Sequence, residues 1–349
     1  MNRIAKPLSG QLLPANRRQG VSVVICAKNE AKNLRQNLPE ILQQRYLDTN
    51  GNPLYEVIVV DDGSEDDTQK VLGELKQQFQ HLRILSVAPA DATGKKNALR
   101  VAMQAAHHNW LLLTDADCSP ASTEWLEHMV SPLAGGKDIV AGYSGYHKSE
   151  GILNGFVRWE TMHTYVQYSS YALAGLPYMA VGRNMACTKT VLQKAMLHPV
   201  WNALPSGDDD LLVQVAGTAD NVAIVCEDAA FTYSPAKTTW QEWAHQKQRH
   251  LSTGKYYKAG TKLMLGTYAL THAGMWLMAA VLLFSPFWWY VPVLMGARGV
   301  LYMILWVSTT RKLKEEIDVY LLPIFDLGWM MYNFAFLPYI TWKNKKNWK

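Results

Sequence analysis

Two clusters of aspartates have the residue types and spacing that chemistry on a phosphate-bearing substrate needs. Asp115 and Asp117 are two residues apart after an apolar run. Two carboxylates, completed by water and phosphate oxygens, suit Mg²⁺ or Mn²⁺. Asp208, Asp209 and Asp210 are consecutive, so their mutual repulsion raises the pKa of at least one of them. A carboxylate with a pKa nearer neutrality can take a proton from a hydroxyl group. A solvated turn is the alternative explanation for the first cluster, and a metal site or an exposed loop for the second.

A second set of residues has the types expected for binding a nucleotide. Asp61 and Asp62 follow an apolar run and precede Gly63-Ser64. One aspartate can accept a hydrogen bond from a base or ribose, and the same segment can also be a turn that caps a helix. Lys95 follows Gly94 at the expected start of a helix. We expect it either to contact a phosphate or to be a solvated lysine.

The elements that must position these residues alternate between strands and helices. The expected strands are 21–27, 55–60, 82–87 and 110–114, and the expected helices are 30–42, 67–79 and 95–107. This alternation predicts an α/β domain with a mostly parallel sheet and right-handed crossovers. Ligands of such sheets bind beyond the carboxyl ends of the strands. The polar segments 28–30, 61–64 and 115–117 all follow strands, so we expect them to converge on one crevice.

The C-terminal part of the chain is apolar enough to enter a membrane. Segments 263–284 and 287–307 can each cross about 30 Å of hydrocarbon, and a short connection predicts that they form a hairpin. Segment 320–340 contains prolines and an aspartate, and we prefer a re-entrant or in-plane segment because it keeps the basic tail 343–349 cytosolic. Arg298 lies in the middle of the second segment, where it must snorkel, pair or meet a lipid phosphate.

Two further segments combine aromatic residues at helical spacing with positions near the membrane part. Segment 156–173 is rich in Tyr and Trp, and segment 239–257 places Trp240 and Trp243 beside several basic residues. Helices of this kind lie in the headgroup zone. An ordinary helix packed on a core remains equally open for the first segment, and an interfacial helix is preferred for the second.

Composition restricts the protein class further. The chain of 349 residues has a net charge of +5, which suits anionic lipids and diphosphates and gives no argument for nucleic acid. Its four cysteines lack the spacing of a zinc or disulfide framework. Residues 1–20 are polar without an apolar segment, so we expect the globular part in the cytoplasm. No Gly-x-Gly-x-x-Gly follows the first strand, which disfavours a dehydrogenase.

In this order, the polar clusters resemble the motifs of the family-2 glycosyltransferases, an inverting, nucleotide-sugar-dependent family with the GT-A fold. The resemblance covers about residues 21–258. It rests on the segments Val23–Glu30, Asp61–Ser64, Gly94–Leu99, Asp115–Asp117, Gly182–Ala186, Asp208–Leu212 and Gln246–His250. Cys26 stands where the family usually has proline, and Asp208 where it has glutamate.

The resemblance assigns a role to each matching residue. It makes Asp209 the catalytic base with Asp208 beside it, and Asp115 and Asp117 the ligands of Mg²⁺ or Mn²⁺. It places the donor, a UDP- or GDP-sugar, on Ala27, Asn29, Glu30, Asp61, Asp62, Lys95, Asp115, Gln246, Arg249 and His250. It puts Gly182, Arg183 and Asn184 on the acceptor side.

The segment Gln246-x-x-Arg249-His250 is similar to the Gln-x-x-Arg-Trp motif of cellulose and hyaluronan synthases. That tryptophan lies at the acceptor terminus, so His250 argues against processive polymerisation. We therefore expect transfer of a sugar to a lipid or lipid-linked acceptor. A processive polysaccharide synthase and a catalytically silent nucleotide-sugar-binding membrane subunit remain as alternatives.

The expected organisation follows from these assignments. A tail (1–20) precedes a GT-A domain (21–234), an interfacial helix (235–258), a membrane region (259–342) and a basic tail (343–349). We expect an integral protein of a bacterial inner membrane with its catalytic domain in the cytoplasm. The sugar, the base, the acceptor and the oligomeric state stay open.

Overall fold

The computed structural model describes residues 13–14, 17–87, 94–203 and 207–341. These residues form two compact units. Unit 1 holds the residues up to 147 and residues 164–236, and unit 2 holds residues 148–163 and the residues from 237 onward. The basic tail and most of the polar N-terminal tail lie outside the described residues.

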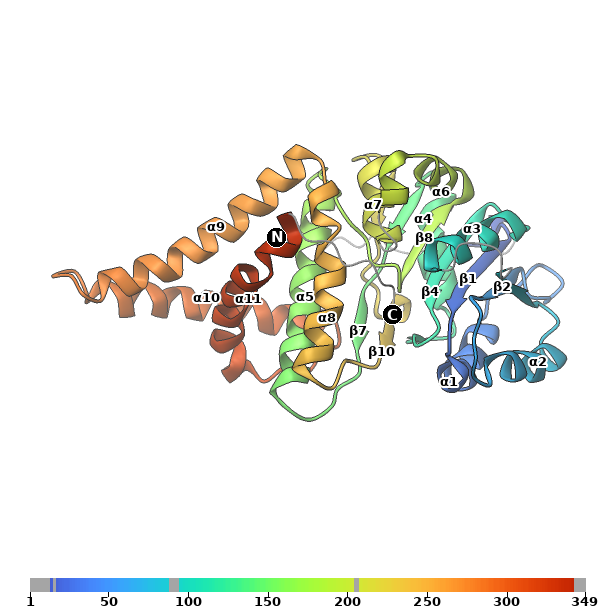
Figure 1. The fold of residues 1–349 in the computed structure, drawn as a ribbon, viewed down its shortest axis with the longest axis horizontal. Coiled ribbons are helices and arrows are strands. Elements are labelled where there is room, and N and C mark those ends of the chain that lie inside the picture. Colours follow the sequence, from blue (N-terminus) through green and yellow to red (C-terminus); the bar gives the residue numbers. More distant parts are fainter. Residues whose placement is uncertain (1–12, 15–16, 88–93, 204–206, 342–349) are drawn as a thin grey trace. The chain divides into compact units, whose positions relative to one another are not determined.

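The centre of unit 1 is a sheet of seven strands in the order β3-β2-β1-β4-β8-β6-β9 (Figure 1). The bounds are β1 (Val21–Ala27), β2 (Tyr55–Asp61), β3 (Leu82–Ser86), β4 (Trp110–Asp115), β6 (Ile139–Ala141), β8 (Met185–Thr188) and β9 (Val222–Ile224). The pairs among β1 to β4 are parallel, and β8 runs antiparallel to both of its neighbours. The mostly parallel sheet is therefore confirmed.

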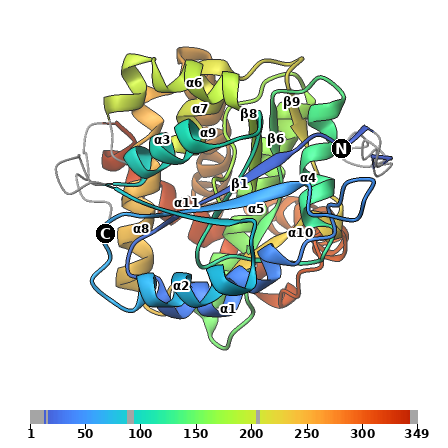
Figure 2. The same ribbon diagram turned by 90° about the vertical axis from the view of Figure 1, so that its right-hand side faces the viewer.

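Helices cover both faces of this sheet because its strands are apolar on both sides. Every residue of β2 is buried, and β1 is buried except at Cys26. The first helices are α1 (Ala31–Leu42), α2 (Thr68–Gln78) and α3 (Lys95–Ala105). Figure 2 shows α1 and α2 on one side of β1 and β2, and α3 on the other side. All seven elements expected from alternation are present, within about two residues of the expected bounds.

The second half of unit 1 is made of short elements. A small sheet joins β5 (Ser119–Pro120), β10 (Thr232–Ser234) and β7 (Ser144–Tyr146). The helices are α4 (Trp125–Ala134), α6 (Lys189–Met196) and α7 (Asp208–Ala216), with 3₁₀ turns η2 (Pro199–Ala203) and η3 (Asp228–Ala230). Helix α5 (Ile152–Leu173) starts in unit 2 and ends in unit 1. Residues 148–163, which lie within the expected domain 21–234, belong to unit 2, and the expected domain boundaries stay a prediction.

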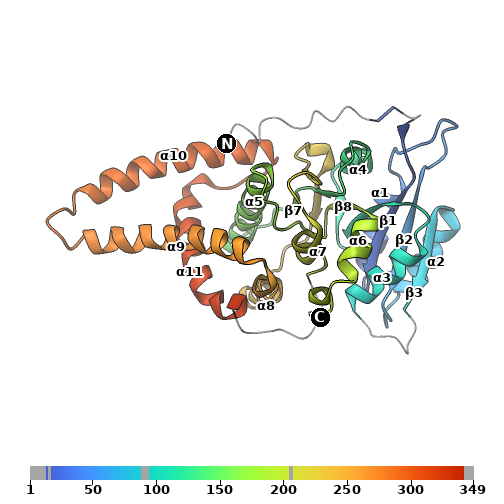
Figure 3. The same ribbon diagram turned by 90° about the horizontal axis from the view of Figure 1, so that it is seen from above.

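Unit 2 contains the apolar C-terminal helices. Its elements are α8 (Trp240–Leu251), η4 (Gly254–Tyr256), α9 (Ala259–Leu282), α10 (Tyr290–Lys312), η5 (Val319–Leu321) and α11 (Leu322–Thr341). Figure 3 shows α9 and α10 as two long helices joined at one end. Among the described residues, three helices are long and apolar enough to cross a membrane, and the third is residues 319–338. This stretch consists of the turn η5 followed by most of α11, and the preference for a re-entrant or in-plane segment stays a prediction.

A polar cluster joins the three apolar helices. Asp326 on α11 accepts hydrogen bonds from Arg298 of α10 (2.8 Å) and from Trp276 of α9 (3.1 Å). The Nε2 atom of His272 lies 3.0 Å from the second carboxylate oxygen. The side chain of Asp326 is 5% exposed. Of the three expected outcomes for Arg298, the structure shows pairing.

Candidate active site

The strand register brings the predicted polar segments together at one edge of the sheet. Ala27, the last residue of β1, lies opposite Asp61, the last residue of β2. Cys26 lies opposite Asp115, the last residue of β4. Three strands therefore end side by side, and the loops that follow them leave from the same edge. This is the convergence that the alternation of strands and helices predicts.

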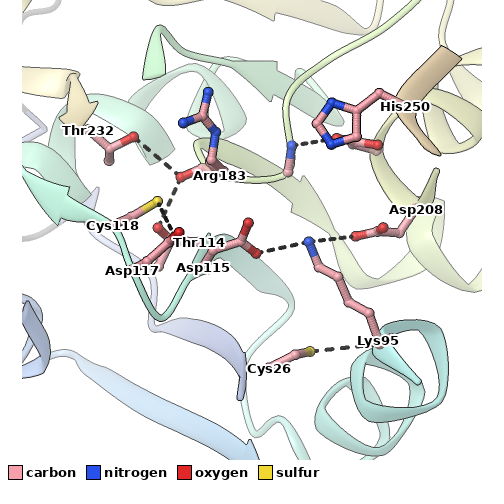
Figure 4. Close-up of polar contacts among 12 residues, drawn as sticks. Cys26, Lys95, Thr114, Asp115, Asp117, Cys118, Arg183, Asp208, Thr232 and His250 are labelled. Carbon is pink, nitrogen blue, oxygen red and sulfur yellow. Dashed lines mark hydrogen bonds and ion pairs between the residues drawn. The ribbon is translucent and has the colours of Figure 1, made fainter. Parts of the chain in front are cut away.

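Lys95 joins two of the predicted acidic clusters. Its Nζ lies 2.9 Å from Oδ1 of Asp115 and 3.4 Å from Oδ2 of Asp208, as Figure 4 shows. Burial disfavours the charged ammonium, but the nearby carboxylates outweigh burial and raise the pKa of Lys95 well above its usual value. Lys95 is therefore a fixed positive charge between the end of β4 and the start of α7.

The three consecutive aspartates form the first turn of α7 rather than an exposed loop. Carboxylates are favoured there by the partial positive charge of a helix N-terminus. Asp208 and Asp210 are 5% and 7% exposed, whereas Asp209 is more accessible. The backbone N–H of Gly182 donates to Oδ2 of Asp209 at 2.8 Å. Burial and the charge of Asp208 raise the pKa of Asp209, against the effects of Lys95 and two backbone N–H groups.

Asp115 and Asp117 are close, but strand alternation does not position them. Strand β4 ends at Asp115, and Asp117 lies in the turn that follows, closed by a hydrogen bond from the N–H of Cys118 to the carbonyl of Asp115 (3.1 Å). The period of two applies only inside a strand. Alternation along β4 therefore does not set the direction of the Asp117 side chain, although the charge of Asp115 still acts on Asp117.

The pair fits a divalent cation by its chemistry. Burial and the charge of Asp115 raise the pKa of Asp117, and the thiol of Cys118 donates to its carboxylate at 3.5 Å. A cation beside Asp117 would offset both causes of the raised pKa. The described residues contain no group of three or more His, Cys, Asp or Glu side chains that could hold a metal alone. Phosphate and water would complete the shell, as is usual for Mg²⁺.

The loops after β1 and β2 are tied together by Asn29. Its backbone N–H donates to Oγ of Ser64, and its side-chain oxygen accepts from the N–H of Glu65, both at 2.8 Å. Asn29 has a φ of 56°, a left-handed conformation that asparagine tolerates better than most residues. The N–H of Glu30 donates to Thr68 at 3.0 Å. Asn29 and Glu30 thus hold the two loops in register at the sheet edge.

The two aspartates after β2 differ in their environment. Asp61 accepts from the N–H of Ser64 (3.0 Å) and from Gln69 (2.9 Å), as expected for a residue that caps a turn. Asp62 accepts from the N–H of Gly94 (2.9 Å), while its buried Oδ1 has no hydrogen-bond partner among the residues that the structure describes. Burial raises the pKa of Asp62. Asp62 is therefore the better candidate to bind a hydroxyl or amine of a nucleotide.

The segment predicted for the acceptor side divides into two kinds of residue. Asn184 is fully buried; its amide donates to the carbonyls of Tyr143 and Ala230 and accepts from the indole of Trp125. These contacts hold the wall of the site and leave Asn184 no surface for a ligand. Gly182 instead contacts Asp209 directly.

Arg183 bridges the large sheet and the small sheet. Its guanidinium donates to Oγ of Ser234 (2.6 Å) and to the carbonyl of Ser144 (3.1 Å), and lies 4.3 Å from the ring centre of Tyr146. Its own carbonyl accepts from the hydroxyl of Thr114 at 2.9 Å (Figure 4). Arg183 also lowers the pKa of Asp117 through its charge, against burial.

Gln246, Arg249 and His250 lie on α8 in unit 2. An Nη2 of Arg249 lies 3.3 Å from Nε2 of His250. Their participation in the site of unit 1 stays a prediction.

Lys96 is a residue near the site that sequence reasoning missed. Its Nζ donates to the carbonyl of Trp201 (2.5 Å) and lies 5.0 Å from the centre of the indole ring. Burial lowers the pKa of Lys96 to about 8, although Asp208 and Asp209 oppose this shift. The sequence signal that could have indicated Lys96 is the pair of consecutive lysines after Gly94.

Comparison with known proteins identifies the class of this fold. A solved mannosyltransferase from Pyrobaculum calidifontis, in complex with GDP-Man and Mn²⁺, superposes with a TM-score of 0.57. The alignment covers 95% of this chain and 92% of that protein at 19% identity, which shows the fold alone. Unit 1 is a GT-A domain.

The family follows from the sequence comparison. Residues 22–193 match the model of Glycosyl transferase family 2, and the chain carries a domain of this family. The glycosyltransferase AglE of Haloferax volcanii is 34% identical over 35% of this chain and 38% of its own length. A beta-monoglucosyldiacylglycerol synthase of Trichormus variabilis is 31% identical over 32% of this chain and 22% of its own length. The chain thus matches well under half of each of these relatives.

Proposed function

We propose that this protein transfers a sugar from a nucleotide-sugar donor to a hydroxyl group of a lipid or lipid-linked acceptor, with inversion at the anomeric carbon. The observation that carries the proposal is the half-buried carboxylate of Asp209, at the helix start that Lys95 links to the edge of the parallel sheet. Transfer by single displacement needs one base and one group that receives the departing diphosphate, and this edge offers both.

Asp209 would accept the proton of the acceptor hydroxyl. Burial and the charge of Asp208 raise its pKa, which makes it a stronger base than an ordinary aspartate. The backbone N–H groups of Gly182 and Asp210 each hold one carboxylate oxygen of Asp209, and a remaining lone pair of that carboxylate would accept the hydroxyl proton. Buried Asp208 pairs with Lys95 and keeps a negative charge beside Asp209.

The donor would bind across the ends of β1, β2 and β4. Asp62 would accept a hydrogen bond from the nucleoside, and Lys95 would exchange part of its contact with Asp115 for the diphosphate. Asp115 and Asp117 would hold Mg²⁺ or Mn²⁺, which supplies charge neutralisation of the departing diphosphate when bound. The Mn²⁺ and GDP-Man in the Pyrobaculum calidifontis structure support this assignment.

A lipid acceptor agrees with the C-terminal helices. Three helices are apolar enough to cross a membrane, and one relative is named for a glucosylated diacylglycerol. We place the catalytic unit on the cytoplasmic side of a bacterial inner membrane, because basic residues Arg311 and Lys312 end α10.

The proposal is tested with the full-length protein in nanodiscs. The protein is incubated with a panel of UDP- and GDP-sugars, a membrane lipid extract and Mn²⁺, and lipids and nucleotides are analysed by mass spectrometry. We expect one donor to yield the nucleoside diphosphate and a lipid heavier by one sugar. A ladder of masses would indicate a processive synthase. No transfer and no hydrolysis with any donor would overturn the proposal in favour of a silent subunit.

A further inference from the structure

An aromatic-lined groove lies between three helices of unit 2. It has a volume of about 360 Å³ and is formed by the start of α5, the start of α8 and most of α11. This volume is within the range of small-molecule binding pockets. None of the described side chains that line it is charged. A polar ligand would therefore find no partner for its charges in this groove.

The floor of the groove is a cluster of rings around Phe156. The ring centres of Trp243 and Phe325 lie 5.6 and 5.7 Å from that of Phe156. Trp243 also packs against Tyr332 (5.7 Å) and Phe336 (5.8 Å). All five side chains are at most 8% exposed. The side chains beneath the groove are thus closely packed, so the groove is not a packing defect beside a loosely placed helix.

The rim of the groove is apolar and open. Trp240, Ile324 and Met331 are 51%, 56% and 61% exposed. One wall is α11, which is itself apolar enough to cross a membrane. An apolar rim on such a helix faces hydrocarbon, so the occupant with matching chemistry is a lipid chain.

Helix α8 places this groove near the residues predicted to close over the donor. Trp243 lies three residues before Gln246 and six before Arg249 on the same continuous helix. At a rise of about 1.5 Å per residue these separations are about 4.5 and 9 Å along the axis. A chain that lies in the groove with its polar end toward the C-terminal end of α8 would place that end within about one headgroup length of this motif.

We propose that the groove binds a hydrocarbon chain of the lipid acceptor and so presents the acceptor's headgroup to the Gln246–His250 end of α8. This inference rests on the proposed function, which it deepens by assigning the site that recognises the lipid. It predicts that the length of the hydrocarbon chain, and not only the headgroup, determines how well an acceptor is used.

The first test maps the occupant on the unaltered full-length protein in phosphatidylcholine nanodiscs. The probes are a diacylglycerol and a polyprenyl phosphate, each with a diazirine on its hydrocarbon chain. After irradiation, we expect labelled peptides from α8 and α11 that carry Trp240 and Met331. The lipid that accepts sugar in the transfer assay should compete, and excess phosphatidylcholine should not. Labelling confined to α9 and α10, or equal competition by phosphatidylcholine, would overturn the inference.

The second test fills the groove. Ala335→Trp adds a large ring at the groove wall, and Leu327→Trp adds the same ring on α11 at an exposed position outside the groove. We expect Ala335→Trp to raise the KM for the lipid acceptor about tenfold or more, because it displaces methylene groups from apolar contact. Nucleotide-sugar hydrolysis should be unchanged in both variants. This unchanged hydrolysis also shows that both variants are folded.

The outcomes separate this inference from the proposed function. If the unaltered protein transfers sugar to no lipid, the proposed function fails. If it transfers sugar and Ala335→Trp matches Leu327→Trp in acceptor KM, the groove is not the acceptor site. Should Ala335→Trp lose donor hydrolysis as well, the labelling of the unaltered protein decides.

Discussion

Asp209 is the accessible member of three consecutive aspartates, and the first prediction concerns its basicity. Asp209→Asn keeps the size of the side chain and its hydrogen bond from Gly182 but removes the base. We expect transfer to fall by about 10²–10⁴-fold, the usual contribution of general-base catalysis. Donor affinity should be nearly unchanged, because Asp62, Lys95 and the metal hold the donor.

Asp210→Asn is the matched control, since Asp210 is buried one residue further along α7. It should lower transfer less than Asp209→Asn does. Turnover and donor binding are measured for both variants. Near-normal turnover in Asp209→Asn, or equal loss of binding and turnover, would remove Asp209 from the base role.

The raised pKa of Asp209 gives a second prediction, on pH dependence. A raised pKa means that the carboxyl keeps its proton to a higher pH than an ordinary aspartic acid, whose pKa is about 3.9. Because the base must be ionised, kcat/KM should fall on acidification well before pH 3.9 is reached. The pH profile of the unaltered protein should show this acidic limb. A profile that stays flat down to about pH 4 would contradict the prediction.

The third prediction concerns the metal. Asp117→Ala removes one of the two carboxylates at the end of β4, and EDTA removes the ion. We expect each to reduce donor hydrolysis and transfer sharply, and Mn²⁺ added after EDTA to restore only the unaltered protein. Isothermal titration of Mn²⁺ with the nucleoside diphosphate gives a readout independent of turnover. Full activity in EDTA would show that Asp115 and Asp117 do not bind a required metal and only form part of a turn.

At the residue scale, the sequence predicted which side chains lie at the same edge of the sheet, but not which ion pairs and hydrogen bonds they form. Strand ends can be located from local patterns, so the meeting of Asp61 and Asp115 was predictable. The bridge of Lys95 to Asp115 and Asp208 joins three elements that are far apart in the sequence. Such a contact depends on tertiary packing, which no local pattern encodes. The burial of Asn184 could not be predicted for the same reason.

Among the elements, the loop that carries Asn184 is held by one buried amide, and this leads to a fourth prediction. Asn184→Ala would leave the indole of Trp125 and two carbonyl groups without partners, at about 1–3 kcal/mol for each buried group. We expect the free energy of unfolding to fall by at least about 2 kcal/mol, and Tm by several degrees. Asn50→Ala, at an exposed turn position, is the control. Equal Tm values for the two variants would show that the amide contributes little.

The long elements were predictable and the short ones were not. β1 and β2 have seven residues each and are flanked by turn signals, whereas β6 and β9 have three residues each. Three residues carry no usable periodicity. The antiparallel strand β8 and the small sheet of β5, β10 and β7 therefore appeared only in the structure. These short strands hold the half of the candidate site that we predict to face the acceptor.

For the whole molecule, the fifth prediction concerns membrane attachment. Helices α9 and α10 have 24 and 23 residues, enough to cross about 30 Å of hydrocarbon. We expect the full-length protein to stay in membranes during alkaline carbonate extraction. A chain ending at residue 258 should be released, although Phe156 and Trp243 would lose their packing against α11 and make it prone to aggregate. Release of the full-length protein would show that its apolar helices do not span the bilayer.

During synthesis, Arg298 reaches the membrane before its partner does. Asp326 follows 28 residues later, on the next helix to emerge from the ribosome. An unpaired arginine in the middle of a helix costs about 2.5–3.5 kcal/mol during insertion through the translocon. The hairpin of α9 and α10 would thus enter the bilayer at a disadvantage, which the arrival of α11 removes. If these helices span a membrane, stable insertion of α10 would therefore wait until α11 has been made.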